Sequence, residues 1–178
     1  MRSPLAAWEN FYIIVGSSAG ALTGLQFVVI ALIADSDTQA TFAEISAFGT
    51  PTIVHFCAVL LLSALLSAPW PTLLPAGIAV TLCGVAGVAY TFGVMYRARQ
   101  QRGYEPILED WVWYAFLPLL AYALLLVGGL VLSASSTYAL AVLAAVSLIL
   151  IFIGIHNAWD TVTYVAVDRR RRGGTGRE

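Results

Sequence analysis

The most polar helical stretch of this sequence is HNAWDTVTY, residues 156–164, near the end of a long apolar segment. His156 and Asp160 are four residues apart, so their side chains share one face of a helix, and Asn157 borders that face. An imidazole titrates near neutral pH, and beside a carboxylate it can exchange protons. This stretch therefore has the residue types of a proton or ion site.

Two further polar residues are expected at the depth of this stretch. His55 lies near one end of a second apolar segment, and Gln26 lies in the corresponding half of the first. When these ends face the same side of a membrane, three helices contribute two histidines, one carboxylate and two amides to one layer. We expect this polar layer to be the most chemically active part of the chain.

Three interpretations of the polar layer are open. The first is a hydrogen-bond network that fixes helix packing, because every polar group in lipid needs a partner. The second is a site for protons, ions or a small polar solute that opens to the cytoplasm. The third is haem or metal ligation by His55 and His156, but soft ligands are missing nearby and no spacing approaches a zinc signature. We therefore expect no metal and no cofactor.

The first apolar segment carries a stripe of small residues. The sequence GSSAGALTG places Gly16, Gly20 and Gly24 at intervals of four, in one helical sector with Glu9 and Asn10. Small residues at this spacing let membrane helices approach closely, within one chain or between subunits, and the same sector could line a solute path. At the outer end of the stripe, Glu9 is either a helix-end carboxylate or a residue that attracts cations to a pore mouth.

Composition identifies the elements that must position these residues. Hydrophobic residues make up 60% of the 178-residue chain and charged residues only 11%, whereas about a quarter of the residues in soluble domains are charged. A helical crossing needs roughly 20 apolar residues, and barrel strands would alternate in polarity, which these segments do not. The predicted crossings are 8–33, 52–68, 73–96, 113–132 and 138–159. The sequence therefore predicts an all-α integral membrane protein, with one five-helix transmembrane domain over residues 1–168.

The nine basic residues, all arginines, predict the orientation. With five crossings Arg2 lies on one side, and the other eight lie opposite: Arg97, Arg99, Arg102, Arg169, Arg170, Arg171, Arg172 and Arg177. Basic residues near helix ends are retained in the cytoplasm, so we expect the amino terminus outside and the carboxyl terminus inside a bacterial inner membrane. The run Arg169–Arg172 is expected to contact anionic lipid from a disordered tail, residues 169–178.

Two sequence features predict irregular or interrupted helices. Pro118, inside the fourth segment, removes one backbone hydrogen bond and predicts a kink. In the connection 34–49, a short interfacial helix is expected before a break at Thr50-Pro51.

These features favour a membrane protein without enzymatic activity. The sequence contains no nucleophile triad, no phosphate-binding glycine loop and no nucleic-acid-binding signature. A chain of this size is too small to enclose a transport route alone, so the leading hypothesis is a homo-oligomeric channel or transporter for ions, protons or a small polar solute. The candidate residues are Gln26, His55, His156, Asn157 and Asp160 at the inner mouth, with Glu9 and Asn10 outside. The rival hypothesis is a non-catalytic accessory or scaffold subunit of a larger membrane complex; a bis-histidine haem or metal-binding protein comes third.

Overall fold

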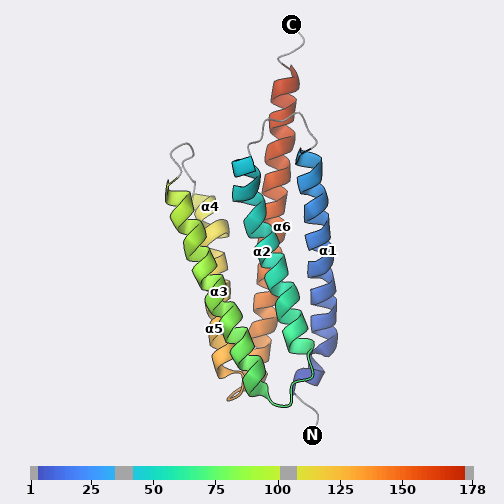
Figure 1. Ribbon diagram of the computed structural model, residues 1–178, viewed down its shortest axis with the longest axis vertical. Coiled ribbons are helices and arrows are strands. Elements are labelled where there is room, and N and C mark those ends of the chain that lie inside the picture. Colours follow the sequence, from blue (N-terminus) through green and yellow to red (C-terminus); the bar gives the residue numbers. More distant parts are fainter. Residues whose placement is uncertain (1–3, 35–41, 101–107, 175–178) are drawn as a thin grey trace.

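The computed structural model of the chain describes residues 4–34, 42–100 and 108–174, and these residues contain helices and no strand. The long helices are α1 (Glu9–Ala34), α2 (Phe42–Ser67), α3 (Leu73–Gln100), α5 (Leu117–Val131) and α6 (Ser136–Gly174) (Figure 1). The short elements are η1 (Pro4–Ala7), α4 (Leu108–Trp111) and the π-helical turn η2 (Val112–Phe116). Five segments are long and apolar enough to cross a membrane, which confirms the all-helical fold and the number of candidate crossings.

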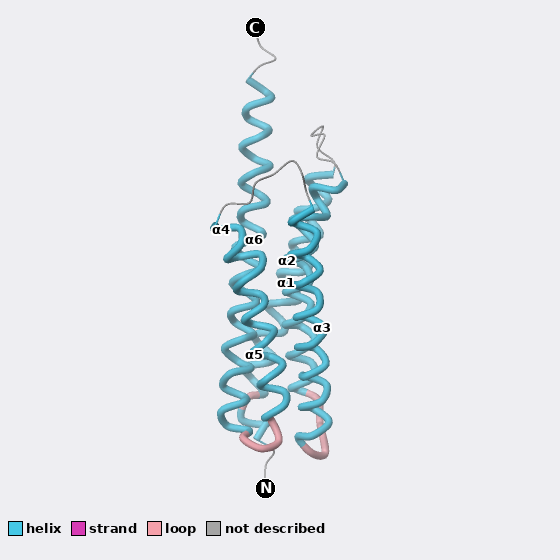
Figure 2. Tube along the Cα trace, turned by 90° about the vertical axis from the view of Figure 1, so that its left-hand side faces the viewer, coloured by secondary structure: helices cyan, strands magenta, loops and turns pink. Residues whose placement is uncertain are grey.

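The long helices run up and down in two layers. In Figure 1, α3, α2 and α1 form the front layer, with α5 and α6 behind them, and the view in Figure 2 separates the same two layers. α3 packs mainly on α5 and α1 packs mainly on α2, while α6 contacts both α2 and α5. α6 therefore joins the two helix pairs into one bundle.

Glycines bring α3 and α5 into backbone contact. A Cβ atom built at Gly84 would lie 2.5 Å from the backbone nitrogen of Leu126, and one at Gly129 would lie 2.6 Å from the backbone nitrogen of Thr81. At Gly77 the added atom would lie 2.8 Å from the Gly129 carbonyl oxygen. Small residues permit such an approach in lipid, where close packing drives helix association. These glycines were not among the predicted packing residues, although the seven-residue spacing of Gly77 and Gly84 puts both on one helical face.

The small-residue stripe of α1 has a close neighbour at one end only. A Cβ atom at Gly16 would lie 2.8 Å from the Ser63 Cβ on α2, whereas at Gly20 the nearest atom, on Leu60, is 3.9 Å away. At Gly24 nothing lies within 4 Å of the added atom. The structure thus places Gly16 in the α1–α2 contact and leaves Gly24 on the exposed side.

A predicted helix break does not occur, and a segment predicted to be disordered is helical. α2 begins at Phe42 and continues through Pro51, which is buried inside the helix, so there is no break at Thr50-Pro51, and the described residues 42–49 belong to α2 and not to a separate short helix. α6 continues to Gly174, through the arginine run at 169–172 that was expected in a disordered tail. A formed helix propagates at little cost and arginine is a good helix former, which explains the longer α6. Residues 35–41 and 175–178 lie outside the described residues.

The irregularity expected at Pro118 is a π-helical turn. η2 directly precedes α5, and the Leu117 N–H donates to the Val112 carbonyl oxygen, five residues back. Pro118, which has no backbone N–H to donate, follows this turn without a break in the helix, since Phe116 and Leu117 both have helical backbone angles. A π turn inserts one residue into the helical register, so it rotates the side chains of α4 relative to those of α5, and Trp113 lies within the turn.

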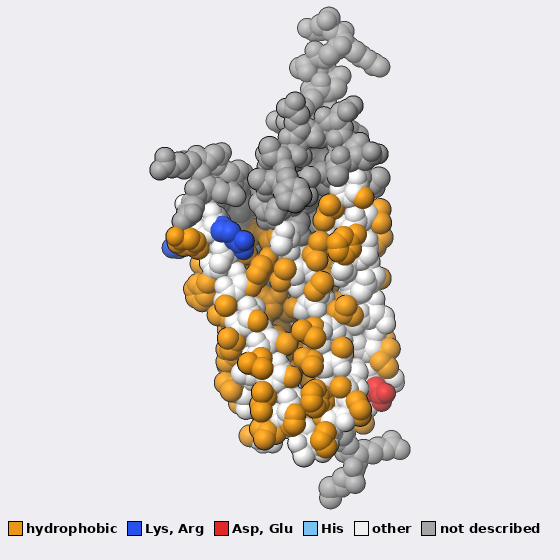
Figure 3. All heavy atoms as spheres, viewed as in Figure 1, with side chains coloured by type: hydrophobic (Ala, Val, Ile, Leu, Met, Phe, Trp, Pro, Cys, Tyr) orange, Lys and Arg blue, Asp and Glu red, His pale blue; other side chains and the backbone are white. Residues whose placement is uncertain are grey.

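The surface of the bundle is apolar between two charged ends. In Figure 3, orange apolar side chains cover the visible face, with blue arginine side chains near one end and a red acidic side chain near the other. Arg97 and Arg99 lie in the last turn of α3, at the end of the bundle opposite Glu9 at the start of α1. Soluble monomers rarely expose continuous apolar surfaces of this extent. Together with the five candidate crossings, this indicates a multi-pass membrane protein.

Candidate functional site

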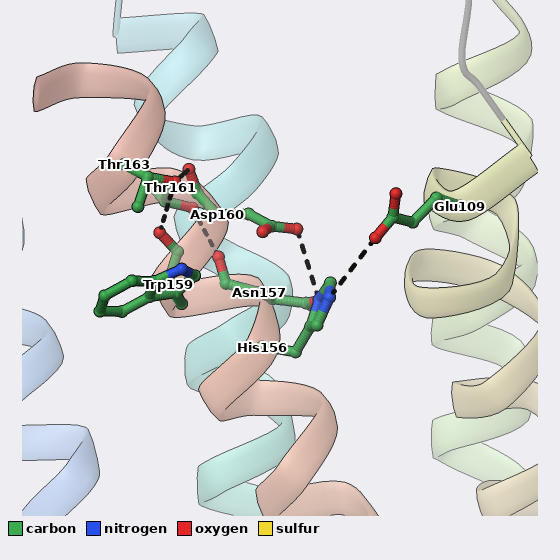
Figure 4. A network of polar contacts seen from close by, with 7 residues as sticks. All are labelled: Glu109, His156, Asn157, Trp159, Asp160, Thr161 and Thr163. Carbon is green, nitrogen blue, oxygen red and sulfur yellow. Dashed lines mark hydrogen bonds and ion pairs between the residues drawn. The ribbon is translucent and has the colours of Figure 1, made fainter. Parts of the chain in front are cut away.

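His156 on α6 lies at the centre of a polar cluster (Figure 4). Its Nδ1 is 3.3 Å from Asp160 Oδ2, one turn further along α6, and its Nε2 is 4.0 Å from Glu109 Oε1 on α4. The ring of Trp113, in η2, stacks on the imidazole with centroids 3.8 Å apart and 6° between the planes. We call these four residues, Glu109, Trp113, His156 and Asp160, the His156 cluster.

The His156 cluster is suited to attract positive charge. Each imidazole nitrogen faces a carboxylate from a different element, and an indole face attracts cations that lie over it. The Nδ1 contact with Asp160 has the distance of an ion pair but lacks the alignment of a hydrogen bond. The two ring nitrogens therefore have separate carboxylate neighbours, as electrostatic contacts and not as hydrogen bonds.

The cluster is open toward the end of the bundle where α3 ends. The exposed fraction of the side chain is 24% for His156, 44% for Asp160 and 66% for Glu109. The exposed fraction therefore increases from the partly buried imidazole to the two carboxylates, which contact the surroundings of the bundle. Both sequence-predicted members of the cluster, His156 and Asp160, come together through their spacing within one helix.

Neighbouring hydroxyls on α6 do not take part in the cluster. Thr161 Oγ1 donates to the Asn157 carbonyl oxygen at 2.9 Å, and Thr163 Oγ1 lies 3.0 Å from the carbonyl oxygens of both Trp159 and Asp160 (Figure 4). Such bonds to the preceding turn satisfy the hydroxyl within its own helix. The polar side chains of the HNAWDTVTY stretch are therefore divided between the cluster and the helix backbone.

His55 has a different partner. It is buried on α2, and its Nδ1 lies 2.9 Å from the Tyr122 hydroxyl on α5, which is also buried. Tyr122 packs against Gly87 of α3, where an added Cβ would overlap its ring. His55 therefore helps to hold α2, α5 and α3 together. Sequence reasoning missed Tyr122, although a tyrosine inside an otherwise apolar segment signals that its hydroxyl needs a partner.

The two amides of the predicted layer are also buried. Asn157 is fully buried on α6, and Gln26 on α1 is only 3% exposed. Neither belongs to the His156 cluster. At the opposite end of the bundle Glu9 and Asn10 are exposed at the start of α1, so they do not contact the cluster either.

The two histidines belong to separate clusters. His55 is paired with Tyr122, while both nitrogens of His156 face carboxylates and its ring is covered by Trp113. Ligation of one haem iron by both rings would break these contacts. Within residues 4–34, 42–100 and 108–174, no three His, Cys, Asp or Glu side chains are grouped to hold a metal ion.

The sequence-predicted residues thus fall into four groups in the structure. His156 and Asp160 meet in one cluster, His55 pairs with Tyr122, Gln26 and Asn157 are buried amides, and Glu9 and Asn10 lie at the far end. The additional members of the candidate site are Glu109 and Trp113, from the segment that precedes α5.

No protein-family model, no curated protein and no solved structure matches the chain.

Proposed function

We propose that this protein conducts protons or small cations across a bacterial inner membrane, as a homo-oligomer, with the His156 cluster at its cytoplasmic mouth. The observation that supports this most is the position of the His156 imidazole between two carboxylates and against an indole face. An isolated structural histidine needs one partner, whereas this ring has two anionic neighbours and partial exposure. Such surroundings are suited to take up and release positive charge.

The orientation supports a cytoplasmic mouth. Arg97 and Arg99 lie at the same end of the bundle as the His156 cluster, and the Arg99 guanidinium carbon is 5.6 Å from the centroid of the Trp111 ring on α4. Arginines at helix ends are retained on the cytoplasmic side. The cluster then faces the cytoplasm, where its carboxylates collect cations and protons.

Conduction by an oligomer follows from the packing of a single bundle. The half of the bundle farther from the cluster has a mainly apolar interior, in which Leu62, Leu66, Leu140 and Leu143 are fully buried beside the buried Tyr12 and Ser63. A charge that crossed this region within one chain would have to leave water and pass these leucines, at a high cost in free energy. We therefore place the outer part of the route between copies of the chain.

The test is ion flux in liposomes that contain the purified protein and an internal pH dye. We expect the wild-type protein to dissipate an imposed pH gradient, and His156→Ala or Asp160→Asn to slow this by roughly tenfold or more, as for the loss of a proton-transfer group. Thr163→Val is the matched control, because its hydroxyl bonds only to the backbone of its own helix. Vesicles that stay sealed to H⁺, Na⁺ and K⁺ would overturn the proposal and favour an accessory role in a larger complex.

A further inference from the structure

Arg97, the last residue of the candidate membrane span of α3, lies folded back along its own helix. Its Nε–H donates to the Gly93 carbonyl oxygen at 3.2 Å, and a Cβ atom built at Gly93 would lie 3.9 Å from a terminal nitrogen of Arg97. The guanidinium group is therefore held beside the last turn of the span. Arginines at the ends of membrane helices usually extend toward water, whereas this one lies along the apolar segment.

The charge of Arg97 has no protein counter-charge in the part of the chain that the structure describes. Within residues 4–34, 42–100 and 108–174, the ion pairs involve His156 and its two carboxylates, and none involves Arg97. The side chain is exposed, and its terminal nitrogens keep their N–H donors for another acceptor. At the end of a membrane span, the anions at the same depth are the phosphates of the lipid headgroups.

A second donor lies on the same face of α3. Tyr90 precedes Gly93 by three residues and Arg97 by seven, so the three residues share one side of the helix. The Arg97 charge is within electrostatic range of the Tyr90 hydroxyl. The oxygen of this hydroxyl is buried and has no hydrogen-bond partner among the described residues. A guanidinium group accepts no hydrogen bond, so an acceptor beside Arg97 would satisfy both donors.

We propose that Tyr90, Gly93 and Arg97 form a binding site for the phosphate of an anionic phospholipid. The phosphate oxygens accept hydrogen bonds from Arg97 and Tyr90, and a change of rotamer at either side chain brings both donors to one phosphate. Gly93 has no side chain that would keep the headgroup away from the helix. With no carboxylate paired to Arg97 among the described residues, an ammonium headgroup finds no counter-charge here, which favours a lipid with net negative charge.

The surface of α3 next to this site suits the acyl chains of the lipid. Leu82, Val85 and Phe92 are exposed along the helix, between the site and the far end of the bundle. In Figure 3, arginine side chains border the orange apolar surface directly at this end. A phospholipid matches this sequence of a cationic site followed by an apolar surface, whereas a free phosphate ion uses only the first part.

Arg99 lies outside the proposed site and offers a matched control. An α-helix turns by about 100° per residue, so Arg99 projects about 200° away from Arg97. Its guanidinium carbon lies 5.6 Å from the centroid of the Trp111 ring, on another element. Both arginines are exposed at the same end of α3 and carry the same charge.

The test is the binding of phosphatidylglycerol to the delipidated full-length protein in a neutral detergent, measured by native mass spectrometry, with phosphatidylcholine as the zwitterionic control. We expect the wild-type protein to prefer phosphatidylglycerol, and Arg97→Gln to weaken this binding roughly tenfold or more, as for the loss of a hydrogen bond to a charged group. Arg99→Gln should leave the affinity nearly unchanged. Equal affinity of the wild-type protein for both lipids, or equal losses in the two variants, overturns the proposal.

Two variants that keep every charge test the geometry of the site. Gly93→Leu places a side chain beside Arg97, and Tyr90→Phe removes only the hydroxyl, so both should weaken the binding of phosphatidylglycerol several-fold. Leucine is a better helix former than glycine, so Gly93→Leu should melt no lower than the wild-type protein without lipid. Wild-type affinity in Gly93→Leu shows that the headgroup does not lie beside this residue, and the proposal fails.

Inorganic phosphate distinguishes a lipid site from a site for a free anion. An excess of inorganic phosphate should not displace phosphatidylglycerol, and complete displacement overturns the assignment to a lipid. The site contains no residue of the His156 cluster, and lipid binding is measured without ion flux. Failure of this proposal therefore leaves the proposed function intact, and sealed vesicles leave this proposal intact.

Discussion

Replacing Gly84 by alanine is expected to force α3 and α5 apart. The added Cβ would lie 2.5 Å from the backbone nitrogen of Leu126, 2.6 Å from its Cα and 2.7 Å from its Cβ. Relaxed contacts between carbon atoms are about 3.5–4.0 Å. Since these atoms belong to the backbone or adjoin it, no change of rotamer relieves the overlap, and the helices must separate by about 1 Å.

Two opposing effects determine how much Gly84→Ala changes the stability of the protein. Overpacking of a closely packed interior costs about 1–3 kcal/mol, whereas alanine is better than glycine in a helix by about 1 kcal/mol. Gly24→Ala gives the second effect alone, because nothing lies within 4 Å of its added Cβ. The difference in stability between the two variants therefore isolates the packing cost. At about 2–4 °C per kcal/mol, the Gly84→Ala variant should melt about 2–12 °C below the Gly24→Ala variant.

The assay is thermal unfolding of both variants in one detergent, followed by loss of the monodisperse gel-filtration peak. Gly129→Ala tests the same contact from α5, where the added Cβ would lie 2.6 Å from the Thr81 nitrogen. It should melt below the Gly24→Ala variant as well. If Gly84→Ala melts at or above Gly24→Ala, then α3 and α5 are not in backbone contact and the reasoning is refuted.

Two further predictions concern the buried histidine and the orientation. Tyr122→Phe leaves Nδ1 of the buried His55 without its hydroxyl partner, so it should reduce the free energy of unfolding by about 1–3 kcal/mol. Tyr138→Phe, at an exposed position, should have no effect on the melting temperature, and equal melting of the two variants would contradict the His55–Tyr122 bond. In a cysteine-free background, Glu9→Cys should react with an impermeant maleimide on intact cells, and Arg99→Cys only after permeabilisation. The opposite labelling pattern would show that the bundle is inverted.

Much of the architecture was predictable because the signals that determine it are local. A crossing of the bilayer requires one continuous apolar stretch, and five such stretches are visible in the sequence and in the structure. Helix ends were less predictable. α2 passes through Pro51, which is buried inside the helix, and α6 passes through the arginine run, because arginine is a good helix former and a formed helix propagates at little cost.

The contacts between helices were less predictable, since they depend on how each helix is rotated against its neighbours. The spacing of His156 and Asp160 within α6 was enough to bring these two together. The sequence did not indicate that Glu109 and Trp113 would complete the cluster, because the π turn of η2 and the packing of α5 on α6 place them there. Likewise His55 pairs with Tyr122, 67 residues away in the chain.

The sequence by itself therefore determined the class of protein, the number of candidate crossings and the uneven distribution of its arginines, all of which are properties of single segments. Only the tertiary structure divided the expected polar layer into the His156 cluster, the His55–Tyr122 pair and the two buried amides. The physical reason is that residues at one depth meet only when their helices are neighbours with facing sides. That choice is made by packing, above all by the close approach of α3 and α5 through their glycines.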